Sequence, residues 1–205
     1  GSDRVSIELY APPGSARFEV SVSDAATGAV IGKTASLTAG ERSTAVVRFD
    51  PDSRRTYAVR VRRLADGPGR FHLVALGADL EIATAKSSVA FPADGPEVIG
   101  VGAVDEDGRR LSYSSCGPNS AHPKPDMVAP VPFMTFCRAR PFAGTSAAAP
   151  QAAGLAAVFW SEHKSWSAGD IGRQLLDASS DLGPPGPDFE TGYGRIRLPK
   201  IQSGQ

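Results

Sequence analysis

The stretch Phe142-Ala143-Gly144-Thr145-Ser146-Ala147-Ala148-Ala149-Pro150 places a serine between a glycine-containing turn and a long run of small apolar residues. Such a run is typical of a helix buried on all sides, and we expect it to extend from Ala147 to His163. Ser146 would then lie at the helix N-terminus, where unpaired N–H groups and the helix dipole stabilise a developing oxyanion. Pro150 is expected in the first turn, where proline is tolerated. The stretch predicts a nucleophile or, more simply, a serine that caps a helix.

Composition and charge exclude several classes of function. The formal net charge is zero, which gives no reason to expect nucleic acid or an anionic membrane as a partner. The longest apolar run, residues 147–160, is too short to span a bilayer. The two cysteines and three histidines match no metal-ligand spacing, so neither a metal nor another cofactor is expected. Cys116 and Cys137 either pair as a disulfide or remain two buried thiols.

The first part of the chain has the pattern of β-strands. Period-two alternation with one apolar face predicts half-buried antiparallel strands, and turn-forming residues lie between the alternating segments. We therefore expect an all-β sandwich over residues 3–84. The segments that alternate are Val5-Ile7-Leu9, Phe18-Val20-Val22, Tyr57-Val59-Val61 and Phe71-Leu73-Ala75.

An arginine-rich region lies in this β part. We interpret it as a solvated sheet face balanced by nearby carboxylates, with an anionic partner as the alternative. His72 is on the outward parity of its strand and is expected to be a surface or edge histidine. The arginines are Arg54, Arg55, Arg60, Arg62, Arg63 and Arg70, and the carboxylates are Asp50, Asp52 and Asp66.

After about residue 85 the pattern changes to alternating strands and helices. Residues 98–104 and 126–130 are continuous apolar runs, which predict strands buried on both faces, as in a parallel sheet. Ser167 is a plausible N-cap of a second helix through about Ala178. Residues 182–188 can only be a loop, and residues 189–196 suggest a short strand or hairpin. An α/β segment over residues 85–205 follows from this alternation.

Five motifs in this α/β segment resemble, in order, motifs of the C-terminal portion of the subtilisin-like serine proteases. The strongest is Gly144 to Pro150, which is similar to the nucleophile motif Gly-Thr-Ser-x-Ala-x-Pro. The others are Phe91-Pro92-Ala93-Asp94, Ser114-Ser115-Cys116-Gly117-Pro118, Lys124-Pro125-Asp126-Met127-Val128-Ala129-Pro130 and Gly192-Tyr193-Gly194-Arg195. The resemblance covers roughly residues 88–197 and makes the first 80-odd residues an inserted β-sandwich.

The resemblance implies a role for several residues. Ser146 would be the nucleophile that forms the acyl-enzyme, and its own N–H would contribute to the oxyanion hole. Ala90, Phe91 and Pro92 would lie near the floor of the pocket for the substrate side chain before the scissile bond. Gly144 and Thr145 would also bind substrate. A cis peptide is expected at Phe91–Pro92, at Ala129–Pro130 or at both.

The departures from the family pattern concern the rest of the catalytic machinery. The family's order is Asp, then His, then Ser, but no Asp-Thr/Ser-Gly motif is present, and none of His72, His122 and His163 is followed by glycine. Asn119, the only asparagine, falls after the position of the family's side-chain oxyanion donor. We expect the chain to be the C-terminal part of a protease whose Asp, His and Asn lie on an N-terminal part, and to be nearly inert alone.

The resemblance also implies partners and a location. The substrate would be a protein or peptide, and the chain would associate with the N-terminal half of the protease domain or with itself. Nucleic acid and membrane are not expected as partners. An extracellular location would allow a Cys116–Cys137 disulfide that fixes the loop before Ser146. The alternative is a pseudoprotease, or a β-sandwich that binds a partner without catalysis.

Overall fold

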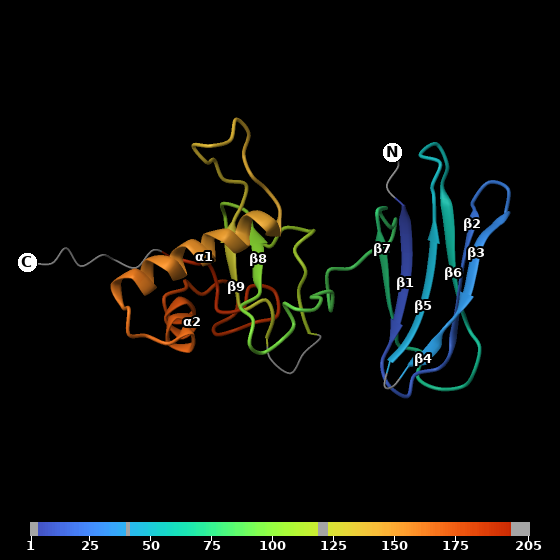
Figure 1. The fold of residues 1–205 in the computed structure, drawn as a ribbon, viewed down its shortest axis with the longest axis horizontal. Helices are drawn as coiled ribbons and strands as arrows, with labels where there is room; N and C mark the ends of the chain where they lie inside the picture. The colour runs from blue at the N-terminus through green and yellow to red at the C-terminus, as the bar shows by residue number, and fades with distance from the viewer. Residues whose placement is uncertain (1–3, 40–41, 119–122, 198–205) are drawn as a thin grey trace, which may run out of the picture. The chain divides into compact units, whose positions relative to one another are not determined.

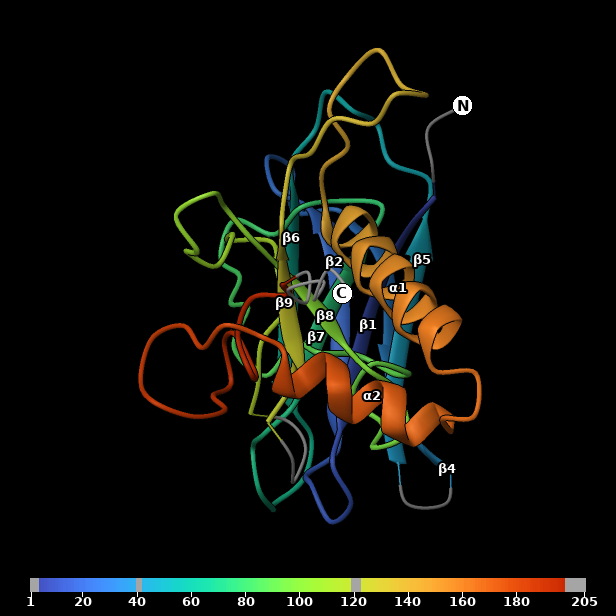
Figure 2. The ribbon, with the colours of Figure 1, turned by 90° about the vertical axis from the view of Figure 1, so that its left-hand side faces the viewer.

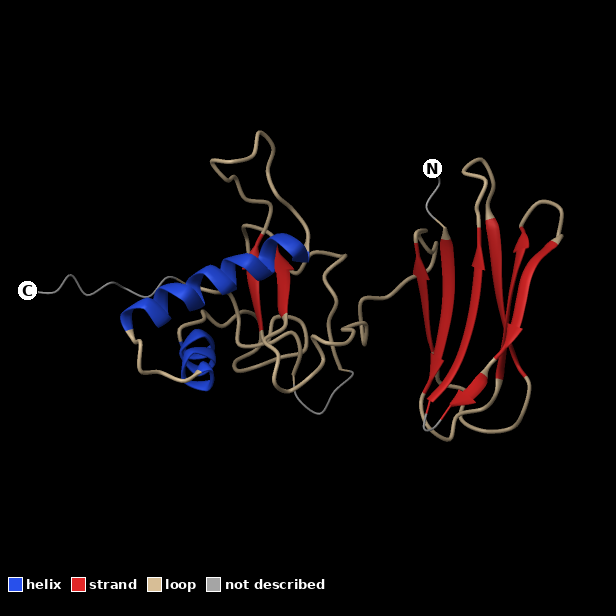
Figure 3. Cartoon of the chain, viewed as in Figure 1, coloured by secondary structure: helices blue, strands red, loops and turns tan. Residues whose placement is uncertain are grey.

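The chain folds into two compact units, Gly1–Ala83 and Thr84–Gln205. The computed structural model describes residues 4–39, 42–118 and 123–197, and each unit is treated by itself (Figure 1). The first unit contains strands and loops, whereas the second combines a short sheet with two helices and long loops (Figure 3).

The first unit consists of two antiparallel sheets that share one hydrophobic core. Their strand orders are β4-β5-β1-β7 and β3-β2-β6. Leu9 from one sheet and Val20 and Val22 from the other are completely buried in this core. The strands are β1 (Val5–Ala11), β2 (Phe18–Asp24), β3 (Val30–Ala35), β4 (Leu37–Ala39), β5 (Arg42–Phe49), β6 (Tyr57–Arg63) and β7 (His72–Leu76). The four strands expected from alternation are all present, and β3, β4 and β5 were not expected.

The arginines of this unit pair with carboxylates that differ in part from those expected. Arg55 lies 2.7 Å from Asp24, and Arg62 lies 3.1 Å from Glu19 on the neighbouring strand. Of the expected partners, Asp52 does pair with Arg54, at 3.1 Å. Neither Asp24 nor Glu19 is close to its arginine in sequence, so only the pairing of β2 with β6 and the adjacent turn brings these charges together.

The second unit is built on a parallel pair of short strands. β8 (Val101–Val104) and β9 (Met127–Pro130) pair with Val101 opposite Met127, and most of their residues are buried. This confirms the expected parallel pairing and two-sided burial, although β8 begins three residues later than the apolar run. Two helices, α1 (Thr145–Glu162) and α2 (Ala168–Asp177), pack on one another, and α1 also packs on both strands.

The helix α1 differs from its expectation in two respects. It begins at Thr145, so Pro150 is its sixth residue rather than part of its first turn, and the Ser146 carbonyl lacks an N–H partner at position i+4. Burial on all sides is also wrong, because one face carries the buried Ala147, Ala148, Ala152, Leu155 and Phe159 while the opposite face is exposed. In the described part of the unit, the strands and α2 cover only one side of α1 (Figure 2).

The C-terminal segment agrees with its expectation in outline. Ser167 caps α2 in a capping box with Asp170, as its position predicted. Residues 182–188 form a loop, and the following segment makes isolated bridges, Asp188 with Gly192 and Arg195 with both Val128 and Ser180, rather than a continuous strand. Among the described residues, no helix has both the length and the apolar character needed to cross a membrane.

Candidate active site

Ser146 lies at the exposed N-terminal end of α1. The preceding Gly144 caps the helix with φ of 90°, a value that glycine adopts readily and other residues rarely do. The amides of Ala147 and Ala148 both donate to the Gly144 carbonyl, at 2.9 and 3.3 Å. The amides of Thr145 and Ser146 therefore lie at the open end of the helix, where the dipole is positive. The Ser146 side chain is exposed, and Gly144 and Thr145 are half-buried.

A paired loop holds this turn in place. Phe133 and Phe142 form an antiparallel bridge, with backbone hydrogen bonds of 3.0 and 2.9 Å in the two directions. Two residues after Phe142, the Gly144 amide donates to the Tyr113 hydroxyl at 3.3 Å. Tyr113 thus contacts the turn beside Ser146, a role that its sequence context gave no reason to predict.

The segment expected to form the substrate pocket is exposed. Ala90, Phe91 and Pro92 are all accessible, and the Phe91 side chain is 87% exposed. The Phe91–Pro92 peptide is cis, which confirms the expectation that at least one of the two candidate bonds would be. Among the described residues, no hydrogen bond links these three residues to Gly144, Thr145 or Ser146.

A buried lysine anchors the chain that follows this segment. Lys124 Nζ donates to the Val98 carbonyl at 2.6 Å and to Asp126 Oδ2 at 2.6 Å. The same Oδ2 atom accepts a hydrogen bond from the Gly100 amide, also at 2.6 Å. Both residues belong to one of the five family-like motifs, but nothing in the sequence indicated that they reach the chain around residue 99.

The described residues of the second unit bring no histidine next to Ser146. His163 follows the last residue of α1, about 25 Å from Ser146 at a rise of 1.5 Å per residue, and its ring stacks on Trp166 at 3.9 Å. His72 belongs to the first unit, where it is half-buried at an edge strand, as expected. His122 and Asn119 lie outside the described residues. The described chain likewise contains no cluster of His, Cys, Asp and Glu that could hold a metal.

The two cysteines are free thiols, so the disulfide alternative is wrong. Cys116 is buried, and burial raises the pKa of its thiol. Cys137 is exposed on the loop before Ser146, with its sulfur 3.3 Å from the Thr135 hydroxyl. The alternative of two buried thiols is therefore correct for Cys116 and wrong for Cys137. The two sulfurs are separated because Cys116 bridges to Lys86, whereas Cys137 lies in an exposed part of its loop.

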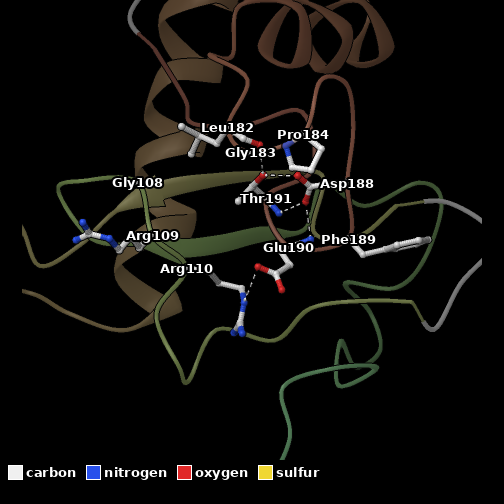
Figure 4. Close-up of a pocket in the computed structure, with 10 residues that line it drawn as sticks. All are labelled: Gly108, Arg109, Arg110, Leu182, Gly183, Pro184, Asp188, Phe189, Glu190 and Thr191. Carbon is white, nitrogen blue, oxygen red and sulfur yellow. Dashed lines mark hydrogen bonds and ion pairs between the residues drawn. The ribbon is translucent and has the colours of Figure 1, made fainter.

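A cavity of about 590 Å³ lies elsewhere in the second unit (Figure 4). Asp188 accepts hydrogen bonds from the amides of Glu190 and Thr191, both at 2.7 Å, and from the Thr191 hydroxyl at 3.0 Å. Glu190 in turn lies 3.8 Å from Arg110 Nε. Asp188 and Thr191 are thus engaged in fixing the loop, and none of the predicted site residues lines the cavity.

A larger cavity, of about 930 Å³, opens at one end of the first unit. Half-buried apolar residues from both sheets line it, among them Leu73 and Val59, and Asp52 and Arg55 are among its polar residues. Solvent therefore reaches the margin of the core at this end, whereas Val22 beneath it stays fully buried. No sequence pattern indicated this opening.

Comparison with known proteins identifies the family. The model of the subtilase family, Peptidase_S8, matches residues 22–194, so the match begins within β2 of the first unit. Subtilisin E of Bacillus subtilis (strain 168) is 33% identical over 119 residues, which are 55% of this chain and 28% of that protein. The halolysin-like extracellular serine protease Nep of Natrialba magadii is 33% identical over 111 residues, covering 53% of this chain and 20% of Nep.

Among solved structures, that of the prenylagaramide maturation protease PagA aligns with a TM-score of 0.45 and 22% identity, over 56% of this chain and 44% of PagA. The chain thus spans less than a third of the length of the two curated relatives described above. Since the family match extends over most of the 205 residues, the chain belongs to the subtilase family.

Proposed function

We propose that this chain supplies the nucleophile of a serine endopeptidase that hydrolyses peptide bonds through an acyl-enzyme on Ser146. The observation that carries the proposal is the exposed Ser146 hydroxyl at the N-terminus of α1, within a Gly-Thr-Ser-x-Ala-x-Pro motif. In the first step Oγ attacks the substrate carbonyl and its proton passes to a base. The Ser146 amide at the positive end of the helix supports the proposal, because it can stabilise the developing oxyanion.

The base, its orienting carboxylate and the side-chain oxyanion donor come from polypeptide outside these 205 residues. Two observations support this part of the proposal. His163 is at the far end of α1, and the chain covers only 28% of subtilisin E. Loss of the triad histidine in subtilisin lowers kcat by about 10⁶-fold. The chain on its own is therefore expected to be almost inactive.

The substrate is a protein or peptide, bound near Ala90, Phe91, Pro92, Gly144 and Thr145. The exposure of Phe91 and the position of Gly144 and Thr145 immediately before Ser146 are compatible with such a role. The location is extracellular, like that stated in the name of the Natrialba relative. The first unit is a β-sandwich inserted into the protease domain, with residues 85–205 as the C-terminal portion of that domain.

The exposed face of α1 is the contact surface for the rest of the protease domain or, failing that, for a second copy of the chain. This face is apolar over almost three turns, and apolar residues exposed in such a row favour association. Its exposed members are Ala149, Pro150, Ala153, Gly154, Ala157 and Val158. The mass of the 205-residue chain in solution tests the point, because a stable monomer at high concentration would contradict self-association.

The alternative is a protein that binds without catalysis, as a pseudoprotease or through its first unit. The cavity of about 930 Å³ in the first unit favours this alternative, because it is lined by half-buried apolar residues of both sheets, such as Leu73 and Val59. A binding protein of this kind would need neither a base nor a reactive serine.

A fluorophosphonate probe on the full-length protein separates the two functions, because it reacts only with an activated serine. We expect Ser146 to be labelled and the S146A variant to be unlabelled. The matched control is S161A, which removes another exposed serine of the same helix, one that donates to the Val158 carbonyl at 2.7 Å. Absence of labelling in the folded wild-type protein would rule out the protease function.

A further inference from the structure

The loop immediately before the turn that carries Ser146 is exposed. Residues 134–141 stand out from the second unit in both ribbon views (Figure 1 and Figure 2), and most of their side chains are accessible to solvent. Phe136 is fully exposed, and Met134 is 63% exposed. The same loop carries two arginines, Arg138 and Arg140, both exposed. The loop therefore presents apolar surface and two positive charges together.

The base of this loop is fixed, and one arginine is held on it. Phe133 and Phe142 pair through two backbone hydrogen bonds, and their rings lie 6.2 Å apart. The Arg138 guanidinium carbon lies 4.5 Å from the centre of the Phe142 ring, which is within the range of a cation–π contact. This contact places the Arg138 charge over Phe142, whose backbone is hydrogen-bonded to that of Phe133.

The two arginines lie in a part of the sequence without carboxylates. No Asp or Glu occurs between Asp126 and Glu162 in the sequence. Within the described residues, neither Arg138 nor Arg140 forms an ion pair, whereas Arg54, Arg55 and Arg62 each do. The loop is consequently a locally positive segment of a chain whose formal net charge is zero.

The short chain between the loop and the nucleophile limits how far these charges lie from Ser146. Phe142 precedes Ser146 by four residues, so their Cα atoms are at most about 14 Å apart. With Arg138 placed over the Phe142 ring, its guanidinium lies within roughly 25 Å of Ser146, a span that about seven residues of extended peptide can cover. A peptide bound with its scissile bond at Ser146 can therefore reach the arginines.

We propose that Arg138 and Arg140 select polypeptide substrates that carry Asp or Glu within about seven residues of the scissile bond. The inference rests on the proposed function, because it assigns a substrate preference to the same site. The carboxylate of the substrate pairs with the guanidinium groups, and Met134 and Phe136 provide apolar contact beside the pair. An acidic peptide is favoured over an anionic lipid surface because the loop that carries the charges leads directly into the turn that holds the proposed nucleophile for peptide bonds.

The test compares matched peptides on the full-length protein. One series of internally quenched peptides carries a single Asp moved stepwise along each side of the cleavage site, and the control series carries Asn at the same positions. We expect kcat/KM to be about three- to ten-fold higher for the best Asp peptide, as for one or two exposed ion pairs. R138Q combined with R140Q should bring this ratio close to one and leave fluorophosphonate labelling of Ser146 unchanged.

Two variants sharpen the interpretation. R109Q removes an exposed arginine of the same unit that already pairs with Asp107, so the ratio should remain at its wild-type value. R138K keeps the charge but loses the planar stacking on Phe142 and should retain part of the preference. A ratio that is unchanged in the double variant, or lost equally in R109Q, would overturn the proposal.

Binding measurements keep the two proposals distinguishable. Fluorescence anisotropy of the labelled Asp peptide is recorded on the S146A protein, which does not cleave it, at low and high salt. Tighter, salt-sensitive binding than for the Asn peptide, lost in R138Q/R140Q, supports the inference even if the wild-type protein proves unreactive. Equal binding of both peptides overturns it. If the protein then co-sediments with phosphatidylserine vesicles and F136S abolishes this, the loop binds an anionic lipid surface instead.

Discussion

Lys124 and Asp126 form an ion pair of 2.6 Å inside the second unit, and the pair ties together two segments that are distant in sequence. The lysine side chain is only 2% exposed. Its ammonium group also donates to the Val98 carbonyl, and the carboxylate accepts the Gly100 amide. The pair therefore connects the start of β9 to the chain that enters β8. Because that chain follows Ala90, Phe91 and Pro92, its position also limits where the proposed substrate segment can lie.

Removal of Lys124 should destabilise the chain strongly. K124M keeps much of the side-chain volume but leaves the Asp126 carboxylate largely buried without its counter-charge, and breaking such a pair costs about 3–5 kcal/mol. Urea denaturation followed by tryptophan fluorescence measures the loss. The control R109M removes an exposed arginine paired with Asp107 and should change the free energy of unfolding by about 0–1 kcal/mol. Equal effects of the two substitutions would contradict a structural role for the buried pair.

Much of the fold could be predicted because burial leaves a periodic trace in the sequence. Val20 and Val22 alternate with half-buried polar residues on β2, and this pattern located the strand. On β5, Val46 interrupts the alternation of the buried Ala45 and Val47. The strand β3 was also missed, because its apolar residues Val30 and Ile31 are exposed and no inward face marks it.

The site could be predicted only where its signal is local. Ser146, its turn and the start of its helix lie within one short motif. The contact of Tyr113 with Gly144 spans 31 residues and depends on how the loops pack. The exposure of one face of α1 could not be predicted either, since an apolar helix sequence does not say which faces the same chain covers.

Stability should fall at low pH through Asp24. Hydrogen bonds from the Thr27 backbone amide and then from the Arg55 side chain lower the pKa of Asp24 to about 2. Since the folded pKa is depressed, the ionised carboxylate stabilises the fold above the pKa of the unfolded chain, which is about 4. This contribution is lost as the pH falls from about 4 to about 2.

The melting temperature measured between pH 7 and pH 2 checks this effect. D24N should melt lower than wild type at neutral pH and should show a smaller decrease on acidification. The control D79N changes an exposed carboxylate that has no hydrogen bond or ion pair among the described residues, so its pH profile should follow that of wild type. Parallel profiles for D24N and wild type would contradict the role of Asp24.

The cap of α2 should contribute to stability. The Ser167 hydroxyl accepts a hydrogen bond from the Asp170 amide, and the Asp170 carboxylate accepts one from the Ser167 amide. S167A removes the first of these bonds and should lower the free energy of unfolding by about 1 kcal/mol. S165A, in the exposed turn just before the helix, is the control and should have little effect.

The same cap should also respond to pH. Hydrogen bonds from the Ser167 hydroxyl and then from its amide lower the pKa of Asp170. The stabilisation is therefore present above the pKa of the unfolded carboxyl and decreases as the pH falls through the folded value. The loss of stability between pH 7 and pH 3 should therefore be smaller in S167A than in wild type. Circular dichroism during thermal unfolding at the two pH values measures this loss for both proteins. An S167A protein as stable as wild type at both pH values would show that the cap contributes nothing.

Gly154 should respond in opposite ways in the isolated chain and in the assembled protease. It lies on the exposed face of α1, and a Cβ added there would meet no atom within 4 Å. Alanine has a higher helix propensity than glycine, so G154A should stabilise the 205-residue chain by up to about 1 kcal/mol. The reverse change on the same face, A153G, should destabilise it by a similar amount.

If the rest of the protease domain packs on this face, however, the methyl group added by G154A meets a closely packed surface and costs energy. G154A should then slow fluorophosphonate labelling of Ser146 in the full-length protein while still raising the melting temperature of the isolated chain. Equal gains in both proteins would mean that this face of α1 remains uncovered, and would contradict its proposed contact with the rest of the domain.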